Sequence, residues 1–401
     1  MIFESEWAGH RLQYVRAILD ALAPLAVSTV FVCGRGTRET QEFATHLEPI
    51  RDRFEVDESG IRTRGKTPQA AAMRRFLDFR KALARHRPDH VYLPYADGLM
   101  QVAGVSRALG LSLSRPGMEM EGLLMRGRFA YEPGPTSVRT RATIKALELS
   151  PFDIVHHLDP VVFEYLLKRC PGLAGRLRLL PEAVERIDVI DKSVARARLG
   201  IPTGGRYIGC LGAMSAAKGV NLLIKAFLRS ALATDIRLLL IGEVDAELQG
   251  LLKGEYLGDM ESGQIMHIDR YVSQEDFHLG FNALDVICTP YPRQIGSSGI
   301  VVRAAAVGRP VLGSEFGWVG RVIRDFELGE TCDVDNGPAF AAKVVRALKI
   351  AENYRPGPKA QHFKAFHSIG NFEAHWTRRL RERLNIGEPR QLVRWEWPSR
   401  C

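Results

Sequence analysis

The stretch Val286–Ser314, VICTPYPRQIGSSGIVVRAAAVGRPVLGS, predicts a strand, a loop, a helix and a second strand. The apolar run that opens it ends at Thr289-Pro290-Tyr291-Pro292, because two prolines stop a strand. The turn Gly296-Ser297-Ser298-Gly299 then leads into a small apolar helix. Such a turn, just past the carboxyl end of a strand, favours an anionic ligand, since free N–H groups and the helix dipole attract phosphate. The alternative is an ordinary turn with a serine cap, and the stretch alone leaves both open.

Length and composition indicate a two-domain globular protein. The chain has 401 residues, of which 46% are hydrophobic and 25% charged. Six cysteines lie scattered without C-x-x-C spacing, which argues against a zinc site or a disulfide framework and fits a reducing compartment. The N-terminus does not resemble a signal peptide, so we expect a cytoplasmic protein.

The charge balance points to an anionic partner. The net charge is +9, and the sequence carries no recognised nucleic-acid module, so we expect no nucleic acid. An anionic membrane surface and a phosphorylated ligand are favoured, while a basic but inert surface stays open. The arginine-rich helix expected at Gln69–Arg87 fits a solvated face better than a membrane-facing patch.

The first half begins as doubly wound domains do. A short strand at Ile2–Ser5 precedes a loop that contains Gly9 and His10, and an amphipathic helix follows at Arg11–Ala23. In this arrangement the loop faces a ligand-binding cleft. Gly9 and His10 are therefore candidate site residues.

Two further candidates follow strands of the first half. Asp97 comes after the strand His90–Pro94, where it meets a ligand or caps the next helix. His156 and His157 end the strand Phe152–His157, and alternation places them on opposite faces. His157 lies nearer the strand end and is the better candidate.

Four motifs in order resemble the retaining glycosyltransferases of family four, which have the GT-B fold. The motifs are LLPEAV at 179–184, Lys218-Gly219, Leu284-Asp285-Val286, and AAAVGRPVL at 304–312. The resemblance implies an α/β protein with two Rossmann-like doubly wound domains facing a cleft. Its expected parts are an acceptor-side domain at 1–183, a domain for the sugar donor at 184–365, and a C-terminal helix and tail at 366–401 that pack back on the first domain.

The resemblance also implies a site for a nucleotide-diphosphate sugar, linked to UDP or GDP, without a metal. Lys218 matches the lysine that binds the phosphate, and Arg270 and Tyr271 lie in the loop that contacts the base in relatives. The turn residues Gly296, Ser297, Ser298 and Gly299 add amides and hydroxyls. With Gly9 these residues form the expected donor site, and His10, Asp97 and His157 are the expected catalytic residues.

Three positions depart from the family pattern. Ala213 stands where the family has arginine, and Ile295 and Arg303 stand where it has glutamates. A guanidinium cannot accept the hydrogen bonds of ribose hydroxyls, because it is only a donor. We expect Arg303 either to pair with a fixed carboxylate, Glu243 or Glu315, or to serve an anionic ligand directly.

The function implied is sugar transfer, with retention, to a saccharide, a lipid-linked acceptor or a small molecule in glycan, glycolipid or glycoconjugate biosynthesis. The enzyme would be hexosyltransferase-like and peripheral at the inner membrane face. On the family's scheme the donor phosphate takes the acceptor proton, so positioning and charge stabilisation suffice. The alternatives are a catalytically inactive GT-B scaffold or partner subunit and, third, a nucleotide-sugar epimerase or phosphorylase on the same fold.

Overall fold

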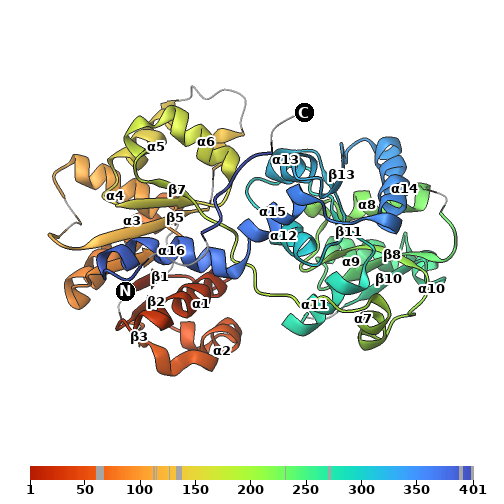
Figure 1. Cartoon of the computed structure of the whole chain (residues 1–401), viewed down its shortest axis with the longest axis horizontal. Helices are drawn as coiled ribbons and strands as arrows, with labels where there is room; N and C mark the ends of the chain where they lie inside the picture. Colours follow the sequence, from red (N-terminus) through yellow and green to blue (C-terminus); the bar gives the residue numbers. More distant parts are fainter. Residues whose placement is uncertain are drawn as a thin grey trace. The chain divides into compact units, whose positions relative to one another are not determined.

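The structure is a computed structural model that describes residues 1–59, 67–111, 113, 115–125, 127–131, 138–230, 232–269, 272–387 and 392–398. The chain forms two compact units. The first unit comprises Met1–Ala183 with Ile369–Val393, and the second comprises Val184–Ser368 with Arg394–Cys401. Each unit has its own parallel sheet, covered on both faces by helices (Figure 1).

The first unit contains a seven-stranded sheet whose chain path reverses at its centre. Across the sheet the strands are β3 (Glu55–Asp57), β2 (Val30–Cys33), β1 (Ile2–Glu4), β4 (His90–Leu93), β5 (Glu119–Leu124), β6 (Ile154–His157) and β7 (Leu177–Leu179). All paired strands run parallel. The order runs outward from β1 in one direction and from β4 in the other, which is the doubly wound pattern.

Helices cover both faces of this sheet, because successive strand residues point to opposite sides. Phe3 joins a core beneath one set of helices, and its neighbour Ile2 joins a core with α1 and α16. The helices are α1 (Arg11–Leu22), α2 (Gln41–His46), α3 (Pro68–His86), α4 (Leu99–Ala108), α5 (Val138–Leu149), α6 (Pro160–Arg169) and α16 (Ile369–Arg383). Short 3-10 turns are η1 (Ala23–Leu25), η2 (Thr37–Glu39), η3 (Glu48–Arg53), η4 (Arg128–Ala130) and η5 (Pro171–Leu173).

The second unit repeats this design with six strands. Across the sheet they are β10 (Ile265–Ile268), β9 (Ile236–Ile241), β8 (Arg206–Leu211), β11 (Val286–Thr289), β12 (Val311–Ser314) and β13 (Gly329–Cys332). Here the path reverses between β8 and β11, which pair through Ile287 and Gly209. These central strands are apolar and buried, as expected for a parallel sheet covered on both faces.

Two cores flank the second sheet, one on each face. Tyr207 and Leu239 contribute to one core, and their neighbours Ile208 and Leu240 contribute to the other. The helices are α7 (Lys192–Leu199), η6 (Ala216–Lys218), α8 (Val220–Arg229), α9 (Ala246–Lys253), α10 (Leu257–Glu261), α11 (Gln274–Ala283), α12 (Gly299–Ala306), α13 (Gly317–Asp325), α14 (Gly337–Asn353) and α15 (Pro358–Phe366). No described helix combines the length and apolar character that crossing a bilayer requires.

The predicted fold class, two Rossmann-like domains with parallel sheets, is confirmed. The apolar pattern does not mark β5, because Glu119 and Glu121 interrupt it. Glu121 is buried between two histidines: it accepts hydrogen bonds from His90 Nε2 at 2.9 Å and from His156 Nε2 at 2.7 Å. Burial alone would raise the pKa of this carboxyl, but the two histidines hold it below its usual value.

The C-terminal segment contributes side chains to the cores of both units. Helix α16 packs against α1 through Phe372, Trp376 and Leu380, all buried in the first unit's core. The expectation that the tail packs on the first domain is wrong for Trp395 and Trp397. Both tail rings pack on the second unit, because its surface offers a cluster of aromatic partners: Phe326, Phe363, Phe366 and His367. An aromatic tail reveals that it will be buried, but not against which surface.

We expect Trp395→Ala to lower the free energy of unfolding of the second unit by about 2–4 kcal/mol, since a half-buried tryptophan loses packing against three phenylalanines. Chemical denaturation and hydrogen exchange in α13 and α15 would measure this loss. Glu396→Ala, an exposed neighbour, is the matched control and should change little. An unchanged unfolding curve for Trp395→Ala would contradict the described packing.

Candidate functional site

The second unit has its topological switch point between β8 and β11. Each strand ends in a loop that leads to a helix: residues 212–219 lead to α8, and residues 290–298 lead to α12. In open parallel sheets, ligands bind outside the carboxyl ends of the strands where the chain path reverses. The sheet thus places the Lys218 loop and the Gly/Ser turn at one edge.

The two loops are in direct contact at Gly219. This residue precedes α8 with a φ of +74°, and a Cβ atom there would lie 1.9 Å from the carbonyl oxygen of Pro290. Backbone therefore lies where any other residue would carry its side chain, so only glycine fits. The close approach brings the N-terminal end of α8 against the loop that leads to α12.

Lys218 ends the short turn η6 in the first of these loops. Its amide donates to the Ser215 carbonyl at 3.1 Å and to the Ser215 hydroxyl at 3.2 Å. Its Nζ donates to the carbonyl of Ala213 at 2.7 Å. Burial of the ammonium among these groups lowers its pKa, and Cys210 opposes the shift. Among the described residues Lys218 has no carboxylate partner, so its charge is available to an anion.

The N-terminal end of α12 has no side-chain cap. Ser298 occupies the N-cap position, yet its side chain accepts no capping hydrogen bond. The amides of a first helical turn have no acceptor within the helix. The Gln294 side chain fixes the loop by donating to the Ser297 carbonyl at 3.1 Å. The turn Gly296-Ser297-Ser298-Gly299 thus follows β11 at the carboxyl edge of the sheet, and the loop that carries Lys218 follows the neighbouring strand β8 at the same edge.

Arg303, on α12, is buried and forms an ion pair with a partly buried carboxylate. Its Nε and Nη2 donate to the two carboxylate oxygens of Glu185 at 3.0 and 2.6 Å. The expectation of a fixed carboxylate is met, but the predicted partners Glu243 and Glu315 are wrong. Glu185 takes that place because it directly follows the entry of the chain into the second unit, 118 residues from Arg303.

The Arg303–Glu185 ion pair packs against side chains of α11 and against the first residue of α12. The Arg303 guanidinium lies 5.4 Å from the ring centroid of Phe277 and against Gly299, whose Cβ would be 2.6 Å from Nη1. His278 Nε2 lies 3.0 Å from a Glu185 oxygen. Burial raises the pKa of Glu185, but His278 and Arg303 outweigh it and bring the value to about 2. Glu185 is therefore ionised at neutral pH and neutralises Arg303.

The first unit presents Gly9 and His10 at the end of β1, next to its own switch point between β1 and β4. Gly9 has a φ of +74°, and no atom lies within 4 Å of the position a Cβ would take. The His10 side chain is exposed, and its Nδ1 lies 3.2 Å from Gln13 Oε1. Both residues border open space at the carboxyl edge of this sheet.

Asp97 follows β4 at the same edge and is half-buried. Its carboxylate accepts a hydrogen bond from the amide of Met125, at the end of β5, at 2.9 Å. Gly98 holds the N-cap position of α4, so Asp97 does not cap that helix. Asp97 therefore joins the ends of two strands and lies one strand from Gly9.

His157 does not lie where the strand pattern predicted. It is 1% exposed, and its Nδ1 accepts a hydrogen bond from the Asp159 amide at 2.9 Å. Burial lowers its pKa to about 3, so the ring is neutral at physiological pH. The strand end is covered in this fold, and His157 fixes the following turn instead of facing solvent.

Sequence reasoning missed a charged cluster at the end of β1. Buried Glu4 accepts from Arg11 Nη1 at 2.8 Å and from Arg75 Nη2 at 3.1 Å, and Arg75 also donates to the Tyr95 carbonyl at 2.6 Å. The sequence could have predicted this cluster from Glu4, because a carboxylate at the end of a buried apolar strand requires positively charged partners. The predicted residues Arg270 and Tyr271 lie outside the described residues.

Comparisons with known proteins agree with this geometry. Residues 205–349, which include the Lys218 loop and α12, match the family model described as Glycosyl transferases group 1. No curated protein matches the chain.

Solved structures resemble the whole chain. Sucrose-phosphate synthase from Thermosynechococcus elongatus is 16% identical with a TM-score of 0.72, and the match covers 96% of this chain and 99% of that one. HepE from Anabaena in complex with UDP is 13% identical with a TM-score of 0.66, over 95% and 99% of the two chains. WaaG, a glycosyltransferase involved in lipopolysaccharide biosynthesis, is 15% identical with a TM-score of 0.61, over 92% and 94%. The chain therefore has the GT-B fold of glycosyltransferases, with a group 1 match in its second unit.

Proposed function

We propose that this protein transfers a sugar from a nucleotide-diphosphate sugar to an acceptor hydroxyl. The observation that carries the proposal is the contact between the two loops at the carboxyl ends of β8 and β11. At one edge of the sheet lie a lysine that has no carboxylate partner among the described residues and the N-terminal end of α12, which has no side-chain cap. A cation and a helix N-terminus together suit a diphosphate.

The chemistry that these groups support is stabilisation of a departing diphosphate. As the glycosidic bond breaks, negative charge grows on the bridging oxygen of the leaving group. Lys218 would exchange its bond to the Ala213 carbonyl for one to a phosphate oxygen, and the first-turn amides of α12 would donate to the same group. Each hydrogen bond that strengthens as the charge grows lowers the barrier.

The stereochemical part of the proposal is retention, as in family four of these enzymes. A phosphate oxygen of the sugar donor takes the proton from the acceptor hydroxyl. This transfer occurs on the same face of the sugar from which the leaving group departs. This route requires positioning and no carboxylate nucleophile. The donor is proposed to be a UDP- or GDP-linked sugar. HepE was solved with UDP and with UDP-glucose, and the structural similarity to HepE supports the UDP-linked donor.

The acceptor side is assigned to the first unit. His10 is exposed at the end of β1, and Asp97 carries a carboxylate at the end of β4. We assign acceptor contacts to these two residues and a turn-supporting role to His157. A saccharide, a lipid-linked sugar and a small molecule all offer the hydroxyl required. The net charge of +9 favours an anionic acceptor or attachment at an anionic membrane surface.

An inactive GT-B scaffold or partner subunit is the second candidate. The observation in its favour is that Arg303 occupies a position where the resembling family has a ribose-binding carboxylate. The Glu185 carboxylate, however, neutralises Arg303, so this substitution leaves no uncompensated cation beside Gly299 at the first turn of α12. Transfer is therefore the preferred function, and an assay of sugar transfer by the nucleotide-binding protein distinguishes the transferase from the scaffold.

Lys218→Ala is expected to weaken UDP or GDP binding by about 1.5–3 kcal/mol, the contribution of a charged hydrogen bond, and to leave uridine or guanosine binding unchanged. Calorimetric titration of the diphosphates and the nucleosides would measure both. The matched control is Lys225→Ala, which removes the same charge from an exposed position on α8. Equal losses for nucleoside and diphosphate would place Lys218 away from the phosphates.

If neither UDP nor GDP binds the unmodified protein at millimolar concentration, the transferase proposal fails. Binding without transfer to any acceptor in a panel of sugars would instead support the scaffold.

Glu185→Gln is expected to reduce stability at neutral pH, and the loss should shrink in acid. The pKa of Glu185 is about 2 in the fold against 4.5 when unperturbed, so its ionised form stabilises the folded state above pH 4.5. That contribution is lost as pH falls from 4.5 towards 2. Unfolding by urea at several pH values would follow the difference. Glu243→Gln, at an exposed position, is the control, and a pH-independent difference for Glu185→Gln would contradict the ion-pair role of Arg303.

A further inference from the structure

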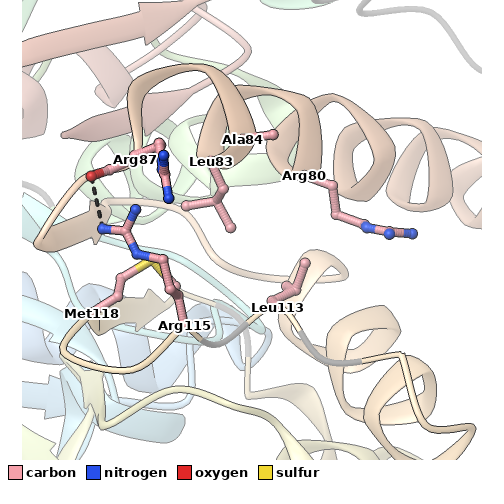
Figure 2. Close-up of a pocket in the computed structure, with 7 residues that line it drawn as sticks. All are labelled: Arg80, Leu83, Ala84, Arg87, Leu113, Arg115 and Met118. Atoms are coloured by element: carbon pink, nitrogen blue, oxygen red, sulfur yellow. Dashed lines mark hydrogen bonds between the residues drawn. The ribbon is translucent and has the colours of Figure 1, made fainter.

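A pocket of about 230 Å³ lies on the first unit, between the last turns of α3 and the segment that precedes β5. Its charged lining consists of Arg80, Arg87 and Arg115, and its apolar lining includes Leu83, Leu113 and Met118. Figure 2 shows Leu83 between Arg80 on one side and the pair Arg87 and Arg115 on the other. The pocket thus combines guanidinium groups with an apolar floor.

The pairing of the cations on α3 distinguishes these arginines from their neighbours. Arg75 pairs with Glu4, Lys81 with Asp78 and Arg85 with Asp57. Among the described residues, neither Arg80 nor Arg87 has a carboxylate within 4.0 Å, and Arg115 donates only to the carbonyls of Arg87 and Pro88, at 2.8 and 3.0 Å. The unpaired positive charge of the helix is therefore concentrated around this pocket.

The pocket also has an apolar floor, formed by Leu83, Leu113 and Met118. Leu113 and Met118 are each 8% exposed, and Leu83 is half-buried. The two bonds that Arg115 donates hold this floor to the C-terminal end of α3. Along the same face of α3, Met73 and Leu77 extend the apolar surface outward, with 47% and 45% exposure. A ligand with a charged group and an apolar body would match both parts.

The pocket is separate from the loops assigned to catalysis. Strands β4 and β5 begin next to it, at His90 and Glu119, so it lies at the amino edge of the sheet. Gly9 and Asp97 follow the carboxyl ends of β1 and β4. In a parallel sheet these two edges are opposite, so a ligand in the pocket does not contact Gly9, His10 or Asp97, the first-unit residues proposed for sugar transfer.

We propose that this pocket binds a phosphate group carried on an apolar body. The Arg87 and Arg115 side chains lie on the same side of Leu83 (Figure 2), where their like charges repel one another, and a phosphate relieves that repulsion while it accepts the paired N–H bonds that arginine offers. Leu83, Leu113 and Met118 contact the apolar body. A soluble phosphate ester and the headgroup of an anionic lipid share this chemistry. The proposal stands independently of sugar transfer.

The test titrates the full-length protein with two probes. Phenyl phosphate represents the soluble ester, with phenol as its uncharged counterpart. Vesicles of phosphatidylglycerol represent the lipid, with phosphatidylcholine vesicles as the neutral counterpart. The variants are Arg80→Ala, which removes a cation that has no carboxylate within 4.0 Å among the described residues, and Ala84→Glu, which adds a carboxylate at an exposed position of the lining.

Arg80→Ala is expected to weaken binding about tenfold to a hundredfold, the effect of losing one charged hydrogen bond, and Ala84→Glu should also weaken binding, because its carboxylate repels the phosphate. Lys81→Ala removes an equal charge from the same helix outside the pocket and should change binding less than twofold. Loss confined to phenyl phosphate identifies a soluble ligand, and loss confined to phosphatidylglycerol vesicles identifies a lipid.

Two results would overturn the proposal. In one, neither charged probe binds the unmodified protein. In the other, Lys81→Ala weakens binding as much as Arg80→Ala, which would indicate a diffuse basic surface. Titration of UDP with the same variants should be unchanged, so a failure of this pocket is distinct from a failure of the proposed transferase site.

Discussion

The contact between Gly219 and the carbonyl of Pro290 is the constraint on which the proposed site depends. The centre of the second sheet is apolar and buried, so β8 and β11 lie side by side by simple burial of their side chains. Their following loops then meet at one edge, and only a residue without a Cβ permits the approach. Lys218 directly precedes this glycine, so the position of its ammonium follows from the backbone contact.

Charge is distributed differently in the two units. In the second unit, Glu185 and Arg303 neutralise each other next to the first turn of α12, and Lys218 has no carboxylate partner in the part of the chain that the structure describes. In the first unit, Glu4 holds Arg11 and Arg75 at the carboxyl edge, whereas the arginines around the pocket at the amino edge have no carboxylate partner among the described residues. Paired charges give a rigid rim, and unpaired charges attract anions.

The sequence predicts the fold well because most strands are continuous apolar runs followed by glycine, proline or polar turns. It fails where burial depends on partners that lie far apart in the chain. Strand β5 escapes detection because Glu121 is compensated by histidines 31 and 35 residues away. For the same reason the partner of Arg303, 118 residues distant, was not predicted. His157 is a different failure, since alternation gives the face of a residue but not what covers it.

The most direct test is a crystal structure of the protein with UDP. The account predicts that the diphosphate lies at the carboxyl edge of β8 and β11. Lys218 Nζ should then leave the Ala213 carbonyl for a phosphate oxygen, and the amides that begin α12 should donate to the same group. A diphosphate bound elsewhere, with Lys218 still bonded to Ala213, would contradict the account.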